Sequence, residues 1–151
     1  MELAHNAVVL VADGRKLLFL RNEGDAAHPN LTVETAEEHP NPANRDQATD
    51  AAGRASSTGA SGGTSRSGSS VEPTDFHQIE EDRFAADAAA MLKSKALANA
   101  FEQLVIVAPP KTLGELRKHY HSEVEKRLVG ELAKDLTGHP VDQIEAALKA
   151  A

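Results

Sequence analysis

The middle of the chain offers almost nothing that a folded core could bury. Between residues 41 and 70 the sequence contains no Val, Ile, Leu, Met, Phe, Trp or Tyr. Residues 53–70 consist only of Gly, Ser, Thr and Ala, together with Arg54 and Arg66. Because no apolar side chain is available, nothing offsets the backbone entropy that ordering this stretch would cost. We therefore predict a mobile low-complexity loop over residues 41–75, inside one domain that spans residues 1–151.

Composition narrows the classes of protein that the rest of the chain can belong to. The net charge is −7, which argues against non-specific nucleic-acid binding, and we expect no DNA partner. The absence of cysteine excludes disulfides, thiolate nucleophiles and cysteine metal sites. The apolar run over residues 7–12 is too short to cross a membrane, and no basic segment precedes it. We expect a cytoplasmic protein without membrane insertion.

The first forty residues carry the pattern of a β-meander. Residues 7–12 form a β-branched apolar run, which is typical of a strand buried on both faces. The dipeptide Asp13-Gly14 follows and favours a type I′ turn, and residues 17–20 then form the returning strand. Apolar and polar residues alternate from Leu31 onward, which predicts a third, half-exposed strand.

After the loop, the pattern changes to helices around one more buried strand. A helix is predicted over residues 77–99, capped by Asp75 and with an apolar stripe that extends to Leu97. Residues 104–107 form a second fully buried strand, and the right-handed crossover rule makes it parallel to the first strand. Thr112 is the expected cap of the next helix. A last helix is predicted to begin at Pro140 and to end near residue 150.

Residues 121–136 support two interpretations. Leucine and valine recur at four-residue spacing, which favours a helix. The alternative is a strand over residues 128–133, because Gly130 would weaken a helix interior by about 1 kcal/mol relative to alanine.

Several short motifs, taken in their order along the chain, resemble a known family. They are Val11-Ala12-Asp13-Gly14, Asp50 with Gly53-Arg54, His77-x-x-Glu80 with Arg83-Phe84-Ala85, Leu104-Val105-Ile106-Val107-Ala108-Pro109-Pro110, Leu113-Gly114-x-Leu116-Arg117 and Lys134-Asp135-Leu136-Thr137. The chain resembles the host attachment protein family, whose members are described as required for attachment to host cells. That family is similar to the central domain of archaeal and eukaryotic peptide chain release factors.

The resemblance implies a fold and favours one of the two interpretations above. It implies an α/β fold with an RNase H-like mixed sheet of about five strands and helices on its faces, interrupted by the long Gly/Ser-rich loop. It also favours the strand over residues 128–133, and we adopt that prediction.

The resemblance also implies two functions. In release factors the loop before the long helix carries Gly-Gly-Gln, which reaches the ester of peptidyl-tRNA; here Gly62-Gly63 is followed by Thr64. The first hypothesis is a translation-linked module that binds the ribosome or tRNA through its loop, with catalysis left open. The alternative is a cytoplasmic interaction protein that is indirectly required for attachment to host cells, without catalysis.

The candidate site residues lie in the loop and at its base. Arginines on a flexible tether can contact phosphates bidentately, although they can equally serve to keep the loop soluble. At the base of the loop, a histidine, a glutamate and an arginine at i, i+3 and i+6 form either a polar cluster or a surface ion pair. The candidates are Arg54, Gly62, Gly63, Arg66, His77, Glu80 and Arg83.

Two residues near the ends of buried strands complete the sequence-based candidates. Lys111 follows a buried strand, at a position where open α/β sheets often bind ligands, although it can also be a surface residue at a helix start. A nuclease is a further hypothesis, but such enzymes need clustered carboxylates, and only Asp13 stands near a core strand end. We expect neither a metal nor a cofactor.

Overall fold

The computed structural model describes residues 1–38 and 73–151 of the chain, and it describes side chains from residue 78 onward in the second part. Most of the predicted loop over residues 41–75 therefore lies outside the described residues. The prediction is wrong at its end, because residues 73–75 already belong to a helix.

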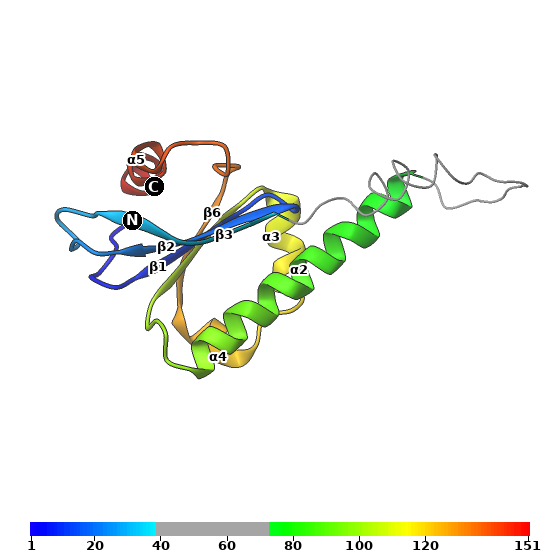
Figure 1. Cartoon of the computed structure of the whole chain (residues 1–151), viewed down its shortest axis with the longest axis horizontal. Helices are drawn as coiled ribbons and strands as arrows, with labels where there is room; N and C mark the ends of the chain where they lie inside the picture. Colours follow the sequence, from blue (N-terminus) through cyan, green and yellow to red (C-terminus); the bar gives the residue numbers. More distant parts are fainter. Residues whose placement is uncertain (39–72) are drawn as a thin grey trace, which may run out of the picture.

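A mixed five-stranded sheet forms the centre of the molecule (Figure 1). The strand order is β3-β2-β1-β5-β6, in which β1 and β6 are parallel to β5 while β2 is antiparallel to both β1 and β3. This arrangement confirms the predicted α/β fold and the parallel pairing of the two buried strands. The strands are β1 (Val8–Ala12), β2 (Lys16–Asn22), β3 (Leu31–Glu38), β5 (Leu104–Ala108) and β6 (Leu128–Ala133).

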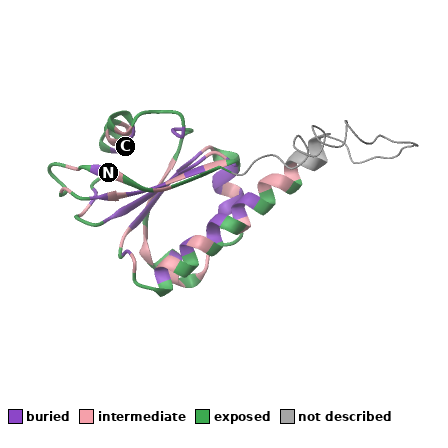
Figure 2. Cartoon of the chain, in the orientation of Figure 1, coloured by how far each residue is buried: buried purple, intermediate pink, exposed green. Residues whose placement is uncertain are grey.

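Helices cover both faces of this sheet and so create three layers (Figure 1). One face packs against α2 (Pro73–Leu97), α3 (Pro110–Arg117) and α4 (Ser122–Arg127). The other face packs against α5 (Val141–Ala150). Figure 2 shows buried residues along the central strands and on the side of α2 that faces them. All residues of β1 and β5 are buried, because each of these strands has a neighbour on both sides and layers above and below.

The hairpin between β1 and β2 is confirmed, but the predicted type I′ turn is wrong. That turn needs positive φ at both central residues, and here only Gly14 has it, at 97°. Gly14 and Arg15 are the central residues, as in a type II′ turn, with Asp13 and Lys16 on either side. The carboxylate of Asp13 replaces part of the usual backbone pairing, because its Oδ1 accepts from the N–H groups of Arg15 and Lys16.

Three details of the predicted helices are also wrong. The long helix begins at Pro73, so Asp75 lies within its first turn and is not its cap. Leu97 is 56% exposed, and Ala96 is buried in its place. The helix α3 has Pro109 at its N-cap position with no side-chain cap, so Thr112 lies inside the helix, where it is buried.

Both interpretations of residues 121–136 hold in part. A short helix, α4, is followed without a break by β6, so the adopted strand over residues 128–133 is confirmed. The helical pattern in the sequence comes from α4, which His121 caps by accepting a hydrogen bond from the N–H of Glu123. Gly130 in β6 packs under Met1, whose sulfur would lie only 3.0 Å from an added Cβ.

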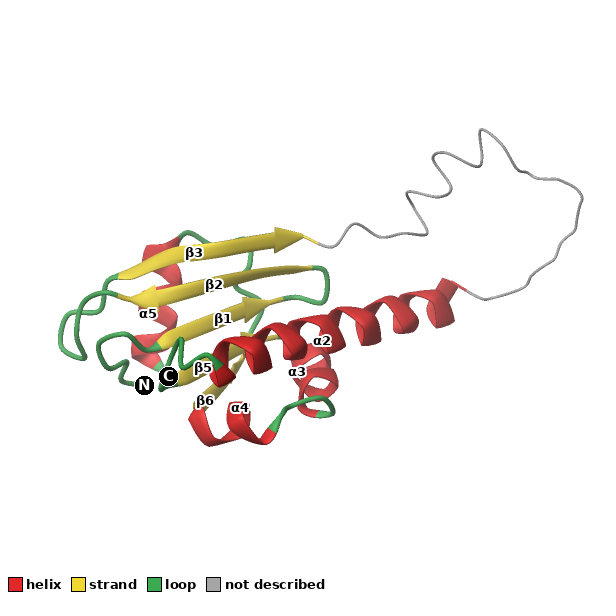
Figure 3. Ribbon diagram, turned by 60° about the horizontal axis from the view of Figure 1, so that its bottom comes forward, coloured by secondary structure: helices red, strands yellow, loops and turns green. Residues whose placement is uncertain are grey.

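The four strands β3, β1, β5 and β6 all end at the same edge of the sheet, which we call the carboxyl edge. This follows because β3 and β1 are both antiparallel to β2, while β1, β5 and β6 are mutually parallel. The chain leaves the described part after β3 at this edge and re-enters it in α2, whose N-terminal turns extend past the sheet (Figure 3). The carboxyl edge is therefore where the segment 39–72 connects to the fold.

Candidate functional site

At the carboxyl edge, the connections that leave the neighbouring strands β1 and β5 run to opposite sides of the sheet. From β1 the chain turns to β2 on one side, and from β5 it continues through α3 and α4 to β6 on the other side. Open α/β sheets bind ligands at such a switch point, outside the carboxyl ends of the strands. The residues that follow β1, β5 and β6 are therefore the first place to look for a site.

Asp13 is the best-connected side chain at this switch point. Its Oδ1 accepts hydrogen bonds from the N–H groups of Arg15 at 2.9 Å and Lys16 at 2.8 Å. Its Oδ2 accepts a hydrogen bond of 2.9 Å from the hydroxyl of Thr137, which follows β6. The carboxylate is thus held in one orientation from two sides.

A second carboxylate shares the same hydroxyl. Oδ1 of Asp135 lies 2.9 Å from Oγ1 of Thr137 and also accepts from the Thr137 N–H at 3.3 Å. The hydroxyl has one proton, so it can donate to only one of the two carboxylates at a time. Thr137 is only 8% exposed, whereas Asp135 is exposed. The arrangement leaves acceptor capacity on both aspartates, because each carboxylate oxygen can accept more than one hydrogen bond.

An ion pair from the helical layer lies beside the hairpin turn. Nζ of Lys111, at the start of α3, lies 3.1 Å from Oε2 of Glu81 on α2. That oxygen is buried and makes no hydrogen bond with the described residues, so the contact with the ammonium group is an ion pair of poor hydrogen-bond geometry. Gly14 packs against both helices, because an added Cβ would lie 3.6 Å from Thr112 Oγ1 and 3.9 Å from Glu81 Cγ.

Asp82, the next residue of α2, forms a second polar contact with α3. A hydrogen bond with Glu115 and another with Gln78 lower the pKa of Asp82, and the positive charge of Lys118 adds to the effect. Nζ of Lys118 donates to Oε1 of Glu115 at 3.2 Å. This surface group lies where α2 passes α3, one residue from Glu81.

The structure describes only some of the candidates that the sequence suggested. Glu80 and Arg83 form an ion pair of 3.6 Å on α2, and the arginine side chain is 57% exposed. His77 belongs to α2, but its side chain lies outside the description. The loop candidates lie outside it entirely; they are Arg54, Gly62, Gly63 and Arg66. Whether these residues meet at the base of the loop therefore stays a prediction.

The sequence did not suggest Glu81 or Thr137 as site residues. It suggested Asp13 and Lys111 only because they stand near the ends of buried strands. The rule that ligands bind beyond strand ends, applied to the adopted strand over residues 128–133, would have pointed to Thr137. Nothing in the sequence places Glu81 beside Lys111, because that contact depends on the angle at which α2 crosses the sheet. The switch-point cluster consists of Asp13, Glu81, Lys111, Asp135 and Thr137.

The chemistry that this cluster supports is hydrogen-bonded recognition. It offers carboxylate oxygens as acceptors, one ammonium group and one buried hydroxyl. Among the side chains that the structure describes, those of residues 1–38 and 78–151, no group of three or more His, Asp or Glu is placed to hold a metal ion. A ligand with hydroxyl or amine donors fits the carboxylates, and an anionic group fits only at Lys111.

Comparison with known proteins adds the class to the α/β fold: the chain is a release-factor-like protein. Residues 6–148 match the family described as bacterial archaeo-eukaryotic release factor family 12. The chain belongs to this family, which confirms the resemblance to release factors and makes a translation-related role the coarse functional assignment.

A relative from Rickettsia prowazekii (strain Madrid E) bears the name Uncharacterized protein RP470. It is 37% identical to this chain over 84 residues, which cover 54% of this chain and 56% of that protein. The match thus spans little more than half the length of the relative, and its name assigns no activity. In the part of the chain that the structure describes, no helix is both long and apolar enough to cross a membrane.

Proposed function

We propose that this chain is a translation-linked module that binds the ribosome or tRNA through the 41–75 loop. The observation that carries the proposal is the family match over residues 6–148, nearly the whole chain. In the release factors that the chain resembles, the connection between the third strand and the long helix reaches the end of the tRNA. Here the connection between β3 and α2 has the same place in the order of elements.

The charge distribution indicates how such binding would work. The net charge of −7 gives no long-range attraction to RNA, so affinity must come from a few local contacts. Arg54 and Arg66 are the basic residues of the low-complexity stretch 53–70. In a plot of the logarithm of the binding constant against the logarithm of the salt concentration, each phosphate that such an arginine neutralises contributes about −0.7 to −0.9 to the slope. The expected association is therefore weak and moderately salt-dependent.

We also propose that binding occurs without hydrolysis of peptidyl-tRNA. In release factors the glutamine of Gly-Gly-Gln helps to place the attacking water, and here Thr64 follows Gly62-Gly63. Purified protein should release no peptide from peptidyl-tRNA. Rapid release that is lost in Thr64→Ala would contradict this part of the proposal without affecting the binding part.

The test is co-sedimentation of the tagged full-length chain with ribosomal particles, in parallel with binding of tRNA in solution. We expect association at low salt and release at high salt. Deletion of residues 53–70 should abolish association, and the double variant Arg54→Ala/Arg66→Ala should weaken it and flatten its salt dependence. A matched control is Lys93→Ala/Lys149→Ala, which removes the same charge from exposed positions on α2 and α5. Association that survives the loop deletion would refute binding through the loop.

The host-attachment function is a second proposal, and the sequence at Thr64 favours it in one respect, because it needs no catalysis. In that case the chain acts as an interaction protein in the cytoplasm, and its effect on attachment is indirect. A chain that shows no association with ribosomes or tRNA at any salt concentration, while its loss reduces attachment of the cells, would support this proposal over the first.

A further inference from the structure

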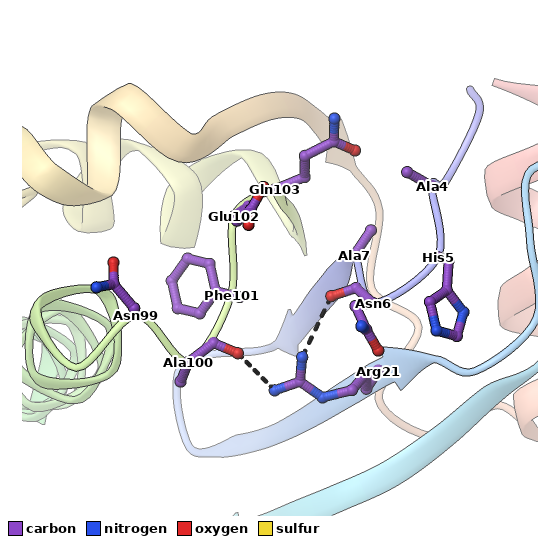
Figure 4. Close-up of a pocket in the computed structure, with 10 residues that line it drawn as sticks. All are labelled: Ala4, His5, Asn6, Ala7, Arg21, Asn99, Ala100, Phe101, Glu102 and Gln103. Carbon is purple, nitrogen blue, oxygen red and sulfur yellow. Dashed lines mark hydrogen bonds between the residues drawn. The ribbon is translucent and has the colours of Figure 1, made fainter.

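A hollow of about 250 Å³ lies at the edge of the sheet opposite the carboxyl edge. Its walls are the segment that leads into β1 and the turn that connects α2 to β5 (Figure 4). The residues around it include His5, Asn6, Asn99, Glu102 and Gln103. The hollow shares no residue with the switch-point cluster, so it requires its own explanation.

Arg21 holds the two walls together. Its Nη1 donates to the carbonyl oxygen of Asn6 at 3.3 Å, and its Nη2 donates to that of Ala100 at 2.8 Å (Figure 4). Its Nε donates to Oε2 of Glu34 at 2.6 Å, in an ion pair that neutralises the guanidinium charge. The hollow is therefore built in advance, but it has no free arginine with which to hold a phosphate or a carboxylate.

The backbone of each wall is left-handed at an asparagine. Asn6 has a φ of 68° and Asn99 a φ of 57°, and they are the only residues other than glycine with positive φ in the described part of the chain. Asn99 stands just after the end of α2, where a left-handed residue is common and where its N–H donates to the carbonyl oxygen of Ala96. Glycine would adopt this conformation at no steric cost, so a change to glycine keeps the turn and removes the amide group.

These side chains have hydrogen-bonding capacity left for a ligand. The amide of Asn6 makes no hydrogen bond to the described residues, although its backbone N–H and carbonyl are both paired. Oδ1 of Asn99 accepts from Nη2 of Arg127 at 3.1 Å, which fixes the amide and leaves its NH₂ group as a donor. Nδ1 of His5 lies 2.7 Å from the carbonyl oxygen of Gly24 and must donate to it, so Nε2 of the neutral ring is an acceptor.

We propose that this hollow binds an unpaired nucleobase. Amide side chains match the mixed donors and acceptors on the edge of a base, and an imidazole at the rim can stack on its face. Neutralised Arg21 and the carboxylate of Glu102 disfavour a phosphate in the same space. The base can belong to a free nucleoside or to single-stranded RNA, since both present the same edge. This proposal goes beyond ribosome or tRNA binding through the loop, because it concerns a different edge of the sheet.

The test measures binding of the four ribonucleosides and of short single-stranded RNA to the full-length chain by calorimetry. The key variants are Asn6→Gly and Asn99→Gly, because glycine keeps the left-handed backbone and removes only the amide. Each should weaken binding about tenfold, which is the lower range for loss of an amide–base contact. Asn30→Gly, at an exposed position outside the hollow, should bind as the wild type does.

Three comparisons separate the possible outcomes. Binding of nucleosides identifies a free nucleoside as a sufficient ligand, whereas binding of RNA alone identifies a base within a strand. RNA binding that is lost in Arg54→Ala/Arg66→Ala but retained in the asparagine variants belongs to the loop and overturns the proposal. Absence of binding by both probes, or equal affinity for single-stranded and duplex RNA, overturns it as well. Thermal melting of each variant shows that the fold is retained.

Discussion

The hydroxyl of Thr137 donates a hydrogen bond of 2.9 Å to Oδ2 of Asp13, and so joins two residues that are 124 positions apart in the chain. Asp13 follows β1 and Thr137 follows β6, and β5 lies between these two strands in the sheet. The bond therefore links the carboxyl ends of β1 and β6 across the end of β5. Because Thr137 is nearly buried, this link should contribute to stability as well as to the shape of the site.

The first prediction concerns this hydroxyl. Thr137→Val keeps the shape of the side chain but leaves Asp13 Oδ2 without its donor, and should lower the free energy of unfolding by about 1.5–3 kcal/mol, as expected for a hydrogen bond to a charged group. Thr137→Ser keeps the hydroxyl and should cost less. Urea denaturation of the two variants and the wild type checks this order. Equal stability of the valine and serine variants would show that the bond contributes nothing.

The central strands were predictable from the sequence, because a strand that is buried on both faces requires a continuous apolar run. Five consecutive residues of β1 and five of β5 are buried, and such apolar runs are bounded by Asp13 and by Pro109. By contrast, the start of α2 was not predictable, because Asp75 has the chemistry of a cap whether or not the helix begins two residues earlier. The junction of α4 and β6 mixes two periodicities within twelve residues, so neither pattern alone gives the boundary.

The candidate site was predictable only where it depends on strand ends. Asp13 and Lys111 follow directly after predicted strands, and the structure places both at the switch point. Their partners Thr137 and Glu81 come from parts of the chain whose placement depends on tertiary packing. The hollow was not predictable, because it depends on how Arg21 ties the two turns together. The left-handed backbone at Asn99, by contrast, belongs to the local end of α2, where the N–H of Asn99 donates to the carbonyl oxygen of Ala96.

The second prediction concerns Asn22, a fully buried polar side chain at the end of β2, on the side of the sheet opposite the carboxyl edge. Its Nδ2 donates to the carbonyl oxygens of Leu3 at 2.9 Å and Ala4 at 3.1 Å, and its Oδ1 accepts from the N–H groups of Gly24 at 3.0 Å and Asn30 at 2.8 Å. Asn22→Ala should lower the free energy of unfolding by about 3 kcal/mol or more, because each buried group left unpaired costs about 1–3 kcal/mol.

Asn22→Asp serves as the matched control for this prediction. The introduced carboxylate would have two carbonyl oxygens, those of Leu3 and Ala4, facing it where the wild type has a donor. Its pKa in the folded state should therefore be raised, so the variant should regain stability as the pH falls and the carboxyl group becomes protonated. Denaturant titrations at several pH values measure both effects. A variant with alanine at this position that is as stable as the wild type would contradict the network.

The third prediction is a gain in stability at Gly114, in the middle of α3. An added Cβ would meet nothing within 4 Å, and the residue has no positive φ. Gly114→Ala should raise the free energy of unfolding by about 0.5–1 kcal/mol, because glycine costs entropy in a helix. Gly24→Ala is the opposite case, because the new Cβ would overlap the carbonyl oxygen of His28 and should destabilise the fold. Thermal melting of the pair tests both signs at once.

The last prediction concerns the pH dependence of stability through Tyr120. Burial, together with the charge of Glu131 and a hydrogen bond to it, raises the pKa of Tyr120 above its usual value of 10.0. The hydroxyl donates to Oε2 of Glu131 at 3.1 Å, and Oε1 of the same carboxylate accepts from Nη2 of Arg117 at 2.6 Å. The folded state thus holds the phenolic proton more tightly than the unfolded state. The resulting stability is present below about pH 10 and is lost as the pH rises further.

This titration can be observed directly, because Tyr120 is the only tyrosine and the chain contains no tryptophan. Ultraviolet absorbance of the phenolate should rise at a higher pH in the native protein than in the same protein in concentrated urea. Glu131→Gln removes the negative charge but keeps an acceptor, so it should move the native midpoint down, toward the unfolded one. Tyr120→Phe should lose less stability than the wild type above about pH 10, because it has no phenol to titrate. Some loss should remain in this variant, because the lysines also titrate in that range. Coincident midpoints in native and unfolded protein would show that Glu131 and burial do not hold the phenol protonated, and would disprove the contact between Tyr120 and β6.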